Sequence, residues 1–230
     1  MSAAKIPPYG KTVEVTPISV TRDSSVYLIV EKGRSCGNPL TVMLESLPED
    51  IYSHCVRVSV VAKLLAEKCE ALPEHEETDA FAYVVWLGGL YHHLGHYAAI
   101  KSKKMLPVYT ESLLKNDMSN IMAPCDANRN AVLDIVRCCY ERLDGSGYPD
   151  GIKGEEISLR ARFVGFANMF DELTAPKSVY SEKSMKQADV QMMKSGTALF
   201  GSDVMACYEQ ARDKIFDMYK NHCESVEDWM

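Results

Sequence analysis

Apolar residues change their spacing near residue 40, where a β-like pattern gives way to a helical one. Residues 12–16 (TVEVT) alternate between polar and apolar side chains, and residues 25–31 (SVYLIVE) are rich in β-branched and aromatic side chains. Both patterns are typical of short β-strands, and a lone pair of strands is only marginally stable in water. We therefore expect an N-terminal β-like extension over residues 1–39, packed on a partner or on a helical domain over residues 40–230.

Helical spacing dominates the second part of the chain. The segment Ala80–His96 is apolar nearly all round, as expected of a buried central helix. Further helices are predicted over residues 129–142, after Ser158 as N-cap, and through an apolar stripe over 204–219, with a Gly/Pro/Asp-rich loop over 144–154. One more helix is indicated by residues that recur at steps of four and three, namely Ile51, Cys55, Val58, Ala62, Leu65 and Cys69. The pattern predicts a mainly α fold with a small N-terminal β element.

Composition and charge exclude several classes of protein. A chain of 230 residues is long enough for one sizeable core, and its formal net charge of −7 gives no overall basic footprint for duplex nucleic acid. The most apolar stretch, Ala80–Tyr91, is too short to span a bilayer, and no apolar core of a signal peptide follows the first lysine. The eight cysteines form no CxxC pair, which favours reduced thiols. We expect a cytoplasmic protein without a membrane partner.

Histidines gather at the end of the apolar segment. His92, His93 and His96 fall within five residues, and His92 and His96 would share one face if the helix continued through them. Asp50 and His54 are also four residues apart, near the start of another predicted helix. Imidazoles and a carboxylate that converge across two helices would suit zinc, iron or manganese. The alternative interpretation is that these histidines are core or helix-end residues bonded to backbone carbonyls.

Three segments further along the chain form an ordered set of motifs. Residues 141–149 read ERLDGSGYP, residues 151–163 read GIKGEEISLRARF, and residues 166–174 read FANMFDELT. Together with His54 in the sequence HCVRV, they resemble the signature of the HD-GYP family of HD-superfamily phosphohydrolases. The resemblance covers roughly residues 45–210. It implies an HD-type bundle of helices, a bacterial source, and a centre of two or three metal ions that hydrolyses cyclic di-GMP or related phosphodiesters.

The ligand set that this resemblance implies is only partly present. His54 and His92 stand at two of the seven expected ligand positions. The residue that should be a carboxylate bridging two ions is a histidine, and a neutral imidazole has no second lone pair for a second ion. Loss of the other five ligands should abolish the usual centre, because metal affinity depends on ligand number and geometry. The residues that depart from the expected pattern are His93, Cys139, Tyr140 and Asn168.

The glycine-rich loop matches the family pattern better than the metal ligands do. Its residues are explained either by fold stability or by a role in ligand binding or docking. The resemblance also places a phosphate-contacting basic residue at about Lys177. The predicted ligand-binding or docking residues are Glu141, Arg142, Asp144, Gly145, Gly147, Tyr148, Pro149 and Lys177.

The sequence favours a domain without enzymatic activity or cofactor in signalling of the cyclic di-GMP type. It would bind a cyclic dinucleotide or another nucleotide, or dock a signalling protein. The alternative is a metal-dependent phosphodiesterase or phosphohydrolase with a single divalent ion of iron, manganese or zinc. A third hypothesis is a homodimer formed through the β-like extension or the last helix. The residues that would hold the single ion are Asp50, His54, His92, His93 and His96.

Overall fold

The computed structural model describes residues 39–70, 72, 77–97, 102–117, 126–175 and 180–222. Within these ranges the chain forms eight α-helices and three short 3-10 helices, and no described residue belongs to a β-strand. The strands predicted at 12–16 and 25–31 lie outside the described residues and stay predictions. The elements are α1 (Pro39–Glu45), α2 (Glu49–Ala66), α3 (Thr78–Tyr91), η2 (Leu94–Tyr97), η3 (Lys103–Met105), α4 (Leu106–Asp117), α5 (Asp126–Cys138), η5 (Gly154–Glu156), α6 (Leu159–Thr174), α7 (Glu182–Phe200) and α8 (Ser202–His222).

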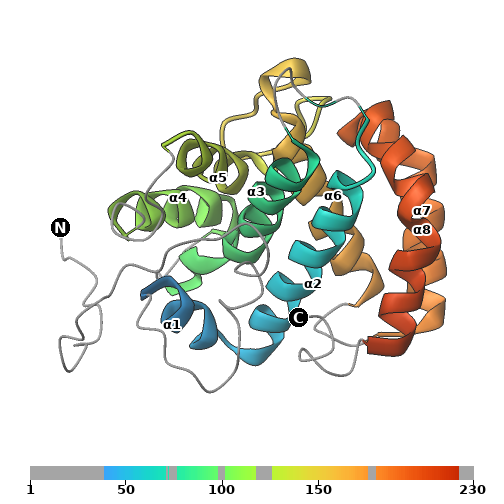
Figure 1. Ribbon diagram of the computed structural model, residues 1–230, viewed down its shortest axis with the longest axis horizontal. Coiled ribbons are helices and arrows are strands. Elements are labelled where there is room, and N and C mark those ends of the chain that lie inside the picture. Colours follow the sequence, from blue (N-terminus) through green and yellow to red (C-terminus); the bar gives the residue numbers. More distant parts are fainter. Residues whose placement is uncertain are drawn as a thin grey trace.

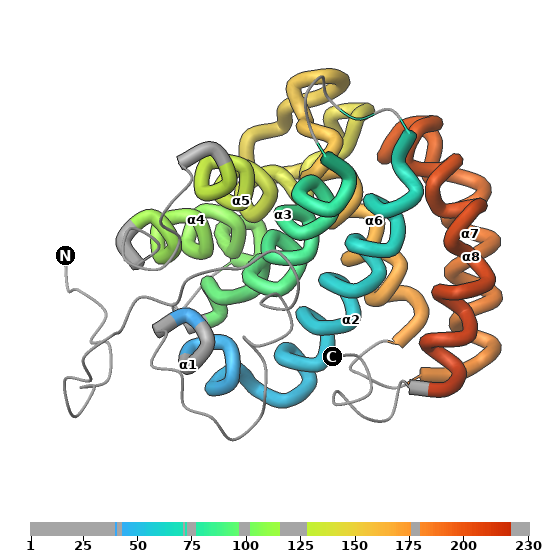
Figure 2. The backbone as a smooth tube through the Cα atoms, viewed as in Figure 1, coloured from blue at the N-terminus to red at the C-terminus, as the bar shows by residue number. Residues whose placement is uncertain are grey.

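Three helices, α2, α3 and α6, form the centre of the bundle. α2 packs against both α3 and α6, and α3 also packs against α5 and α6. α4 and α5 lie on one flank of this centre, and the consecutive helices α7 and α8 lie on the other (Figure 1). The last described helix, α8, returns to pack against α2 (Figure 2). The mainly α bundle predicted from the sequence is confirmed.

The stripe predicted on α2 faces the centre of the bundle. Its members Cys55, Val58, Ala62 and Leu65 are fully buried. Burying a Val or Leu side chain stabilises the fold by roughly 1.5–3 kcal/mol, so this stripe fixes the rotation of the helix about its axis. With the rotation fixed, the adjacent His54 is held against the end of α3 and against α6.

A close approach between α2 and α3 depends on a glycine. A Cβ atom added to Gly89 would lie 2.7 Å from the Cα atom of Ser59, which belongs to the backbone of α2. Only a residue without a side chain allows the two helices to pack at this distance. The approach brings the C-terminal end of α3, and the histidines that follow it, against the middle of α2.

The apolar segment predicted as one helix over Ala80–His96 ends earlier than expected. α3 stops at Tyr91, and after a short turn the 3-10 helix η2 follows. Thr110 of α4 contacts this turn: its hydroxyl accepts from the Gly95 N–H at 3.0 Å, and its single proton is shared between the carbonyls of Leu106 at 2.9 Å and His92 at 3.2 Å. His92 and His96 therefore do not share an α-helical face, because the helix does not continue through them.

Other predicted elements are close to those observed. Ser158 caps α6, because its hydroxyl accepts from the Ala161 N–H at 3.2 Å. The loop at 144–154 has no α-helix, and the helix predicted over 129–142 is α5, which lies four residues earlier at its C-terminal end. The apolar face predicted near the C-terminus is buried on α8. The sequence pattern did not single out α4 or α7.

The described cysteines behave as small apolar residues. Cys55, Cys69, Cys138, Cys139 and Cys207 are buried, and these five described cysteines form no disulfide with one another. Among the described residues, no helix combines the length and the apolar composition that crossing a bilayer requires.

Candidate functional site

Three imidazole rings meet where the end of α3 touches the middle of α2. His54 comes from α2, while His92 and His93 directly follow α3. The rings of His92 and His93 are 4.2 Å apart between centroids, and those of His54 and His93 are 4.8 Å apart. One nitrogen atom from each ring lies within 4.8 Å of the other two. We call these residues the three-histidine cluster. It unites three of the five metal ligands that the sequence suggested.

Two rings of the cluster donate outward and leave a lone pair inside. His92 Nδ1 lies 2.6 Å from the Gly89 carbonyl oxygen, and His54 Nδ1 lies 2.7 Å from an Asp171 carboxylate oxygen. Because both partners can only accept, Nδ1 carries the proton in each ring, and a neutral ring then has its lone pair on Nε2. Metal-binding histidines are held in this way by a carboxylate or carbonyl behind the ring.

The side chain of Asn168 on α6 faces both of these lone pairs. Its Oδ1 atom lies 3.0 Å from His54 Nε2 and 3.1 Å from His92 Nε2. An amide oxygen is also an acceptor, so three acceptors converge on one point. Two arrangements satisfy them: a cation among the three atoms, or a half-turn of the carboxamide that directs its NH₂ group at both rings.

The third ring of the cluster has a free nitrogen atom. His93 Nε2 forms a short hydrogen bond with the Tyr140 hydroxyl. His93 Nδ1 is buried and has no hydrogen-bond partner among the described residues. Leaving a buried polar atom without a partner costs about 1–3 kcal/mol of stability, so a ligand bound to this nitrogen atom would stabilise the site.

These residues fit one metal ion. Two ligands of a tetrahedral zinc ion, each at about 2.0–2.1 Å, lie about 3.3–3.4 Å apart, so cluster nitrogens within 4.8 Å need only a small inward movement. They do not fit a bridged pair of ions, because the cluster contains no carboxylate. When bound, the ion would supply a positive charge beside His54, His92 and His93.

Burial keeps the inner rings neutral. It lowers the pKa of His92 to about 3, and the neighbouring His54 ring acts in the same direction. Burial also places the pKa of His93 well below its ordinary value, with His92 and His54 adding to the effect. The lone pairs of both rings are therefore available at neutral pH.

A buried carboxylate on α6 orients the cluster from behind. Asp171 accepts from Arg57 Nε at 2.6 Å and from the Tyr219 hydroxyl at 2.6 Å, in addition to His54. Burial alone would raise the pKa of Asp171, but the hydrogen bonds from His54 and Arg57 and the positive charge of Arg57 lower it to about 2. Asp171 therefore stays ionised and ties α2, α6 and α8 together behind the site. The sequence motif contained Asp171 but gave no sign of this role.

The glycine-rich loop is held by internal contacts. Glu141 Oε1 accepts from the backbone N–H groups of Asp150 and Gly151 at 2.7 and 3.0 Å, while Oε2 is buried without a partner among the described residues. A Cβ atom on Gly147 would lie 2.4 Å from the Glu141 Cα atom. Arg142 donates to backbone carbonyls of its own segment. These contacts favour the structural explanation for Glu141, Arg142 and Gly147.

The loop reaches the cluster through two tyrosines. The ring of Tyr148 stacks on that of Tyr140 with 5.0 Å between centroids, and Tyr140 in turn contacts His93. Asp144 is exposed and accepts from the Ser146 N–H at 2.9 Å in a local turn. Lys177 lies outside the described residues.

The remaining residues of the predicted metal set lie outside the cluster. Asp50 is exposed at the start of α2. His96 is half-buried in η2, with its ring 5.0 Å from that of His93. Burial lowers the pKa of His96, and the negative charge of Asp50 opposes this. Cys139, at a position where the family has a histidine, is fully buried, burial raises the pKa of its thiol, and it lies outside the three-histidine cluster.

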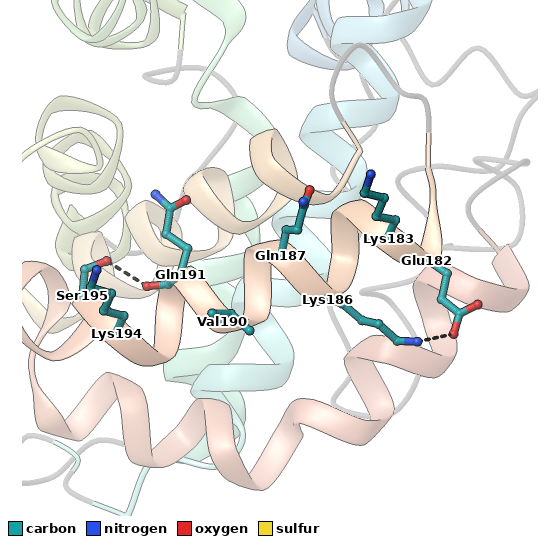
Figure 3. A pocket seen from close by; sticks show the side chains of 8 residues that line it. All are labelled: Glu182, Lys183, Lys186, Gln187, Val190, Gln191, Lys194 and Ser195. Atoms are coloured by element: carbon teal, nitrogen blue, oxygen red, sulfur yellow. Dashed lines mark hydrogen bonds and ion pairs between the residues drawn. The ribbon is translucent and has the colours of Figure 1, made fainter.

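A shallow hollow runs along the outer side of α7 (Figure 3). All of its lining residues come from this one helix, and none belongs to the three-histidine cluster. Lys186 pairs with Glu182 at 2.9 Å there, and Val190 is 67% exposed. A single helix face with solvated lysines is ordinary protein surface. The buried cluster is therefore the better candidate for a functional site.

Comparison with known proteins agrees with this arrangement. The family described as HD domain matches residues 107–204. The chain is 29% identical over 143 residues to a cyclic di-GMP phosphodiesterase of Pseudomonas aeruginosa. The matched region covers 59% of this chain and 33% of that protein. It is 28% identical over 87 residues to a cyclic di-GMP phosphodiesterase of Thermotoga maritima, covering 38% and 24% of the two chains.

A third relative acts on a different cyclic dinucleotide. The chain is 31% identical over 80 residues to the 3'3'-cGAMP-specific phosphodiesterase 3 of Vibrio cholerae, covering 35% of this chain and 17% of that protein. The matched regions thus span a third or less of the length of these three relatives. With the ordered motifs, the all-helical described fold and the histidines at the end of α3, these matches show that the chain contains an HD-superfamily domain of the HD-GYP-like kind.

Proposed function

We propose that this domain binds a cyclic dinucleotide or a related phosphoester in bacterial signalling and does not hydrolyse it through a two-metal centre. One observation carries the proposal: the inward groups at the two positions where the family pattern has aspartates are the neutral side chains of His93 and Asn168. The substrate class follows from the relatives, which are named as phosphodiesterases of cyclic di-GMP or 3'3'-cGAMP.

Two-metal hydrolysis needs an anionic bridge between the ions. Paired ions stabilise both the attacking and the leaving oxygen atoms of the phosphate, and carboxylates hold them a fixed distance apart. The buried carboxylate that contacts the cluster, Asp171, already accepts from Arg57, His54 and Tyr219. A neutral imidazole offers one lone pair, so His93 cannot take over the bridging role.

Binding and cleavage can be separated in one set of measurements. Purified protein is titrated with cyclic di-GMP and with 3'3'-cGAMP in a calorimeter, and the same mixtures with Mn²⁺, Fe²⁺ or Zn²⁺ are analysed chromatographically for linear dinucleotide. We expect saturable binding without product. Product that forms with a metal and disappears in His92→Gln would refute the proposal, and so would the absence of binding to both ligands.

A second candidate function is a phosphohydrolase with one metal ion. It is favoured by the buried His93 Nδ1 atom without a described partner and by the outward hydrogen bonds of His54 and His92. A single ion can activate water for attack on a phosphomonoester. Metal-dependent release of phosphate that is lost in His92→Gln but kept in His96→Gln would support this candidate. Docking of a signalling protein and a homodimer stay predictions from the sequence.

A further inference from the structure

We infer that the three-histidine cluster binds a single ion per chain and prefers zinc over manganese, unlike a site built from carboxylates. The inference concerns the identity and number of the metal ion. It therefore goes beyond the proposed function and stands whether or not a phosphoester binds. Four features of the described residues lead to it.

The first feature is the fixed direction of two lone pairs. The Gly89 carbonyl at 2.6 Å and the Asp171 carboxylate at 2.7 Å hold the protons of His92 and His54 on Nδ1. Turning the His92 ring over would remove its hydrogen bond to the Gly89 carbonyl, and turning the His54 ring over would remove one of the donors to the buried Asp171 carboxylate. Both Nε2 atoms are thus held toward the inside of the site as preorganised ligands.

The second feature is the oxygen atom that meets these lone pairs. Asn168 Oδ1 lies 3.0 and 3.1 Å from the two Nε2 atoms, although all three atoms are acceptors. A cation bound among them turns this repulsive arrangement into a set of ligands. The buried His93 Nδ1 atom, without a described partner, provides a third nitrogen ligand.

The third feature is the chemistry of the donors. Three imidazole nitrogens and one amide oxygen carry no negative charge. Imidazole suits zinc, whereas carboxylate, carbonyl and water oxygens suit magnesium and manganese. A site with aspartates in place of His93 and Asn168 would contain two hard anionic oxygen ligands. The presence of His93 and Asn168 instead therefore sets the preference for zinc over manganese.

The fourth feature limits the number of ions. Tyr140 forms a hydrogen bond with His93 Nε2, which leaves this ring only Nδ1 for a metal. Tyr140 replaces a histidine of the family pattern, so the position of a second set of ligands is taken up by a bond between two side chains. One ion per chain is therefore the expected stoichiometry.

The test compares metal content in matched proteins. The full chain, without an affinity tag that binds metal, is stripped with a chelator and dialysed against equal concentrations of Zn²⁺ and Mn²⁺. Bound metal per chain is then measured by elemental mass spectrometry. Most nitrogen sites bind zinc more tightly than manganese. The ratio of bound zinc to bound manganese is therefore compared between the wild type and the double variant His93→Asp/Asn168→Asp. We expect one zinc ion per chain in the wild type and a ratio about tenfold or more lower in the variant.

Further measurements guard against loss of structure. Circular dichroism checks that each variant is folded, and Co²⁺ added to the wild type reports tetrahedral coordination through its visible absorption, independently of any variant. His96→Gln, outside the cluster, should retain zinc, whereas His92→Gln should lose it. Wild-type protein without metal would mean that the Asn168 carboxamide has turned its NH₂ group toward both rings, and would overturn the inference. Two ions per chain, or an unchanged ratio in the folded double variant, would overturn it as well.

Discussion

Asp171→Asn removes one buried negative charge at nearly constant size, and its cost follows from the contacts of that carboxylate. Asp171 accepts from Arg57 Nε at 2.6 Å, from Arg57 Nη2 at 3.0 Å, and from His54 and Tyr219. The Arg57 side chain is only 4% exposed, so its charge would stay buried after losing this carboxylate. Breaking a buried ion pair in this way costs about 3–5 kcal/mol, against a total stability of roughly 5–15 kcal/mol for a typical domain.

Urea unfolding followed by circular dichroism measures this loss. Tyr219→Phe removes one neutral donor to the same carboxylate and should cost less, about 1–2 kcal/mol. Glu182→Gln is the matched control for charge removal, because its ion pair with Lys186 is exposed and should not contribute measurably. If Asp171→Asn loses no more stability than Tyr219→Phe, the charge of Asp171 does not balance that of Arg57, and the role assigned to it here is wrong.

Three further predictions test other parts of the structure. Burial lowers the pKa of His92 from 6.5 to about 3, so the unfolded chain binds more protons between these values. The stability of chelator-treated protein should therefore fall as the pH drops from 6.5 toward 3, by up to about 1.4 kcal/mol per pH unit for this one group. Unfolding midpoints that do not change with pH in this range would contradict the neutral, buried ring. Gly89→Ala should destabilise the fold by about 1–3 kcal/mol, because its Cβ atom would meet the backbone of Ser59 at 2.7 Å; thermal unfolding unchanged from the wild type would refute this. Ser158→Ala should cost about 0.5–2 kcal/mol through loss of the α6 cap, measured by urea unfolding.

The helices could be predicted where local spacing alone determines them. α2 follows from its apolar stripe, and the start of α6 follows from the capping serine, because both signals lie within a few residues of the element. The end of α3 could not be predicted in this way. The His92 carbonyl bonds to Thr110, which lies 18 residues further along the chain. Such a contact exists only once α4 has packed beside α3.

The sequence indicated which histidines form the candidate site but not which contacts orient their side chains. Its histidines could be selected because they match a family pattern and cluster in the sequence. Which nitrogen atom of each ring faces inward depends on Gly89 and Asp171, and these contacts arise from tertiary packing. Asp50 and His96 satisfied the same spacing rules, yet both lie outside the cluster: Asp50 is exposed at the start of α2, and α3 ends before His96.

His93 and Tyr140 show that a count of lost metal ligands does not fully describe how this site differs from the family pattern. Each departs from the family pattern and, taken alone, each reads as one more missing metal ligand. The structure brings them together in a direct hydrogen bond inside the site, with both side chains buried. Removing one partner without a polar replacement, as in Tyr140→Phe, would leave His93 Nε2 as a buried polar group without this bond, at a cost of about 1–3 kcal/mol. The two departures are therefore better explained as one exchange, in which a bond between side chains replaces part of a metal centre, than as two independent losses.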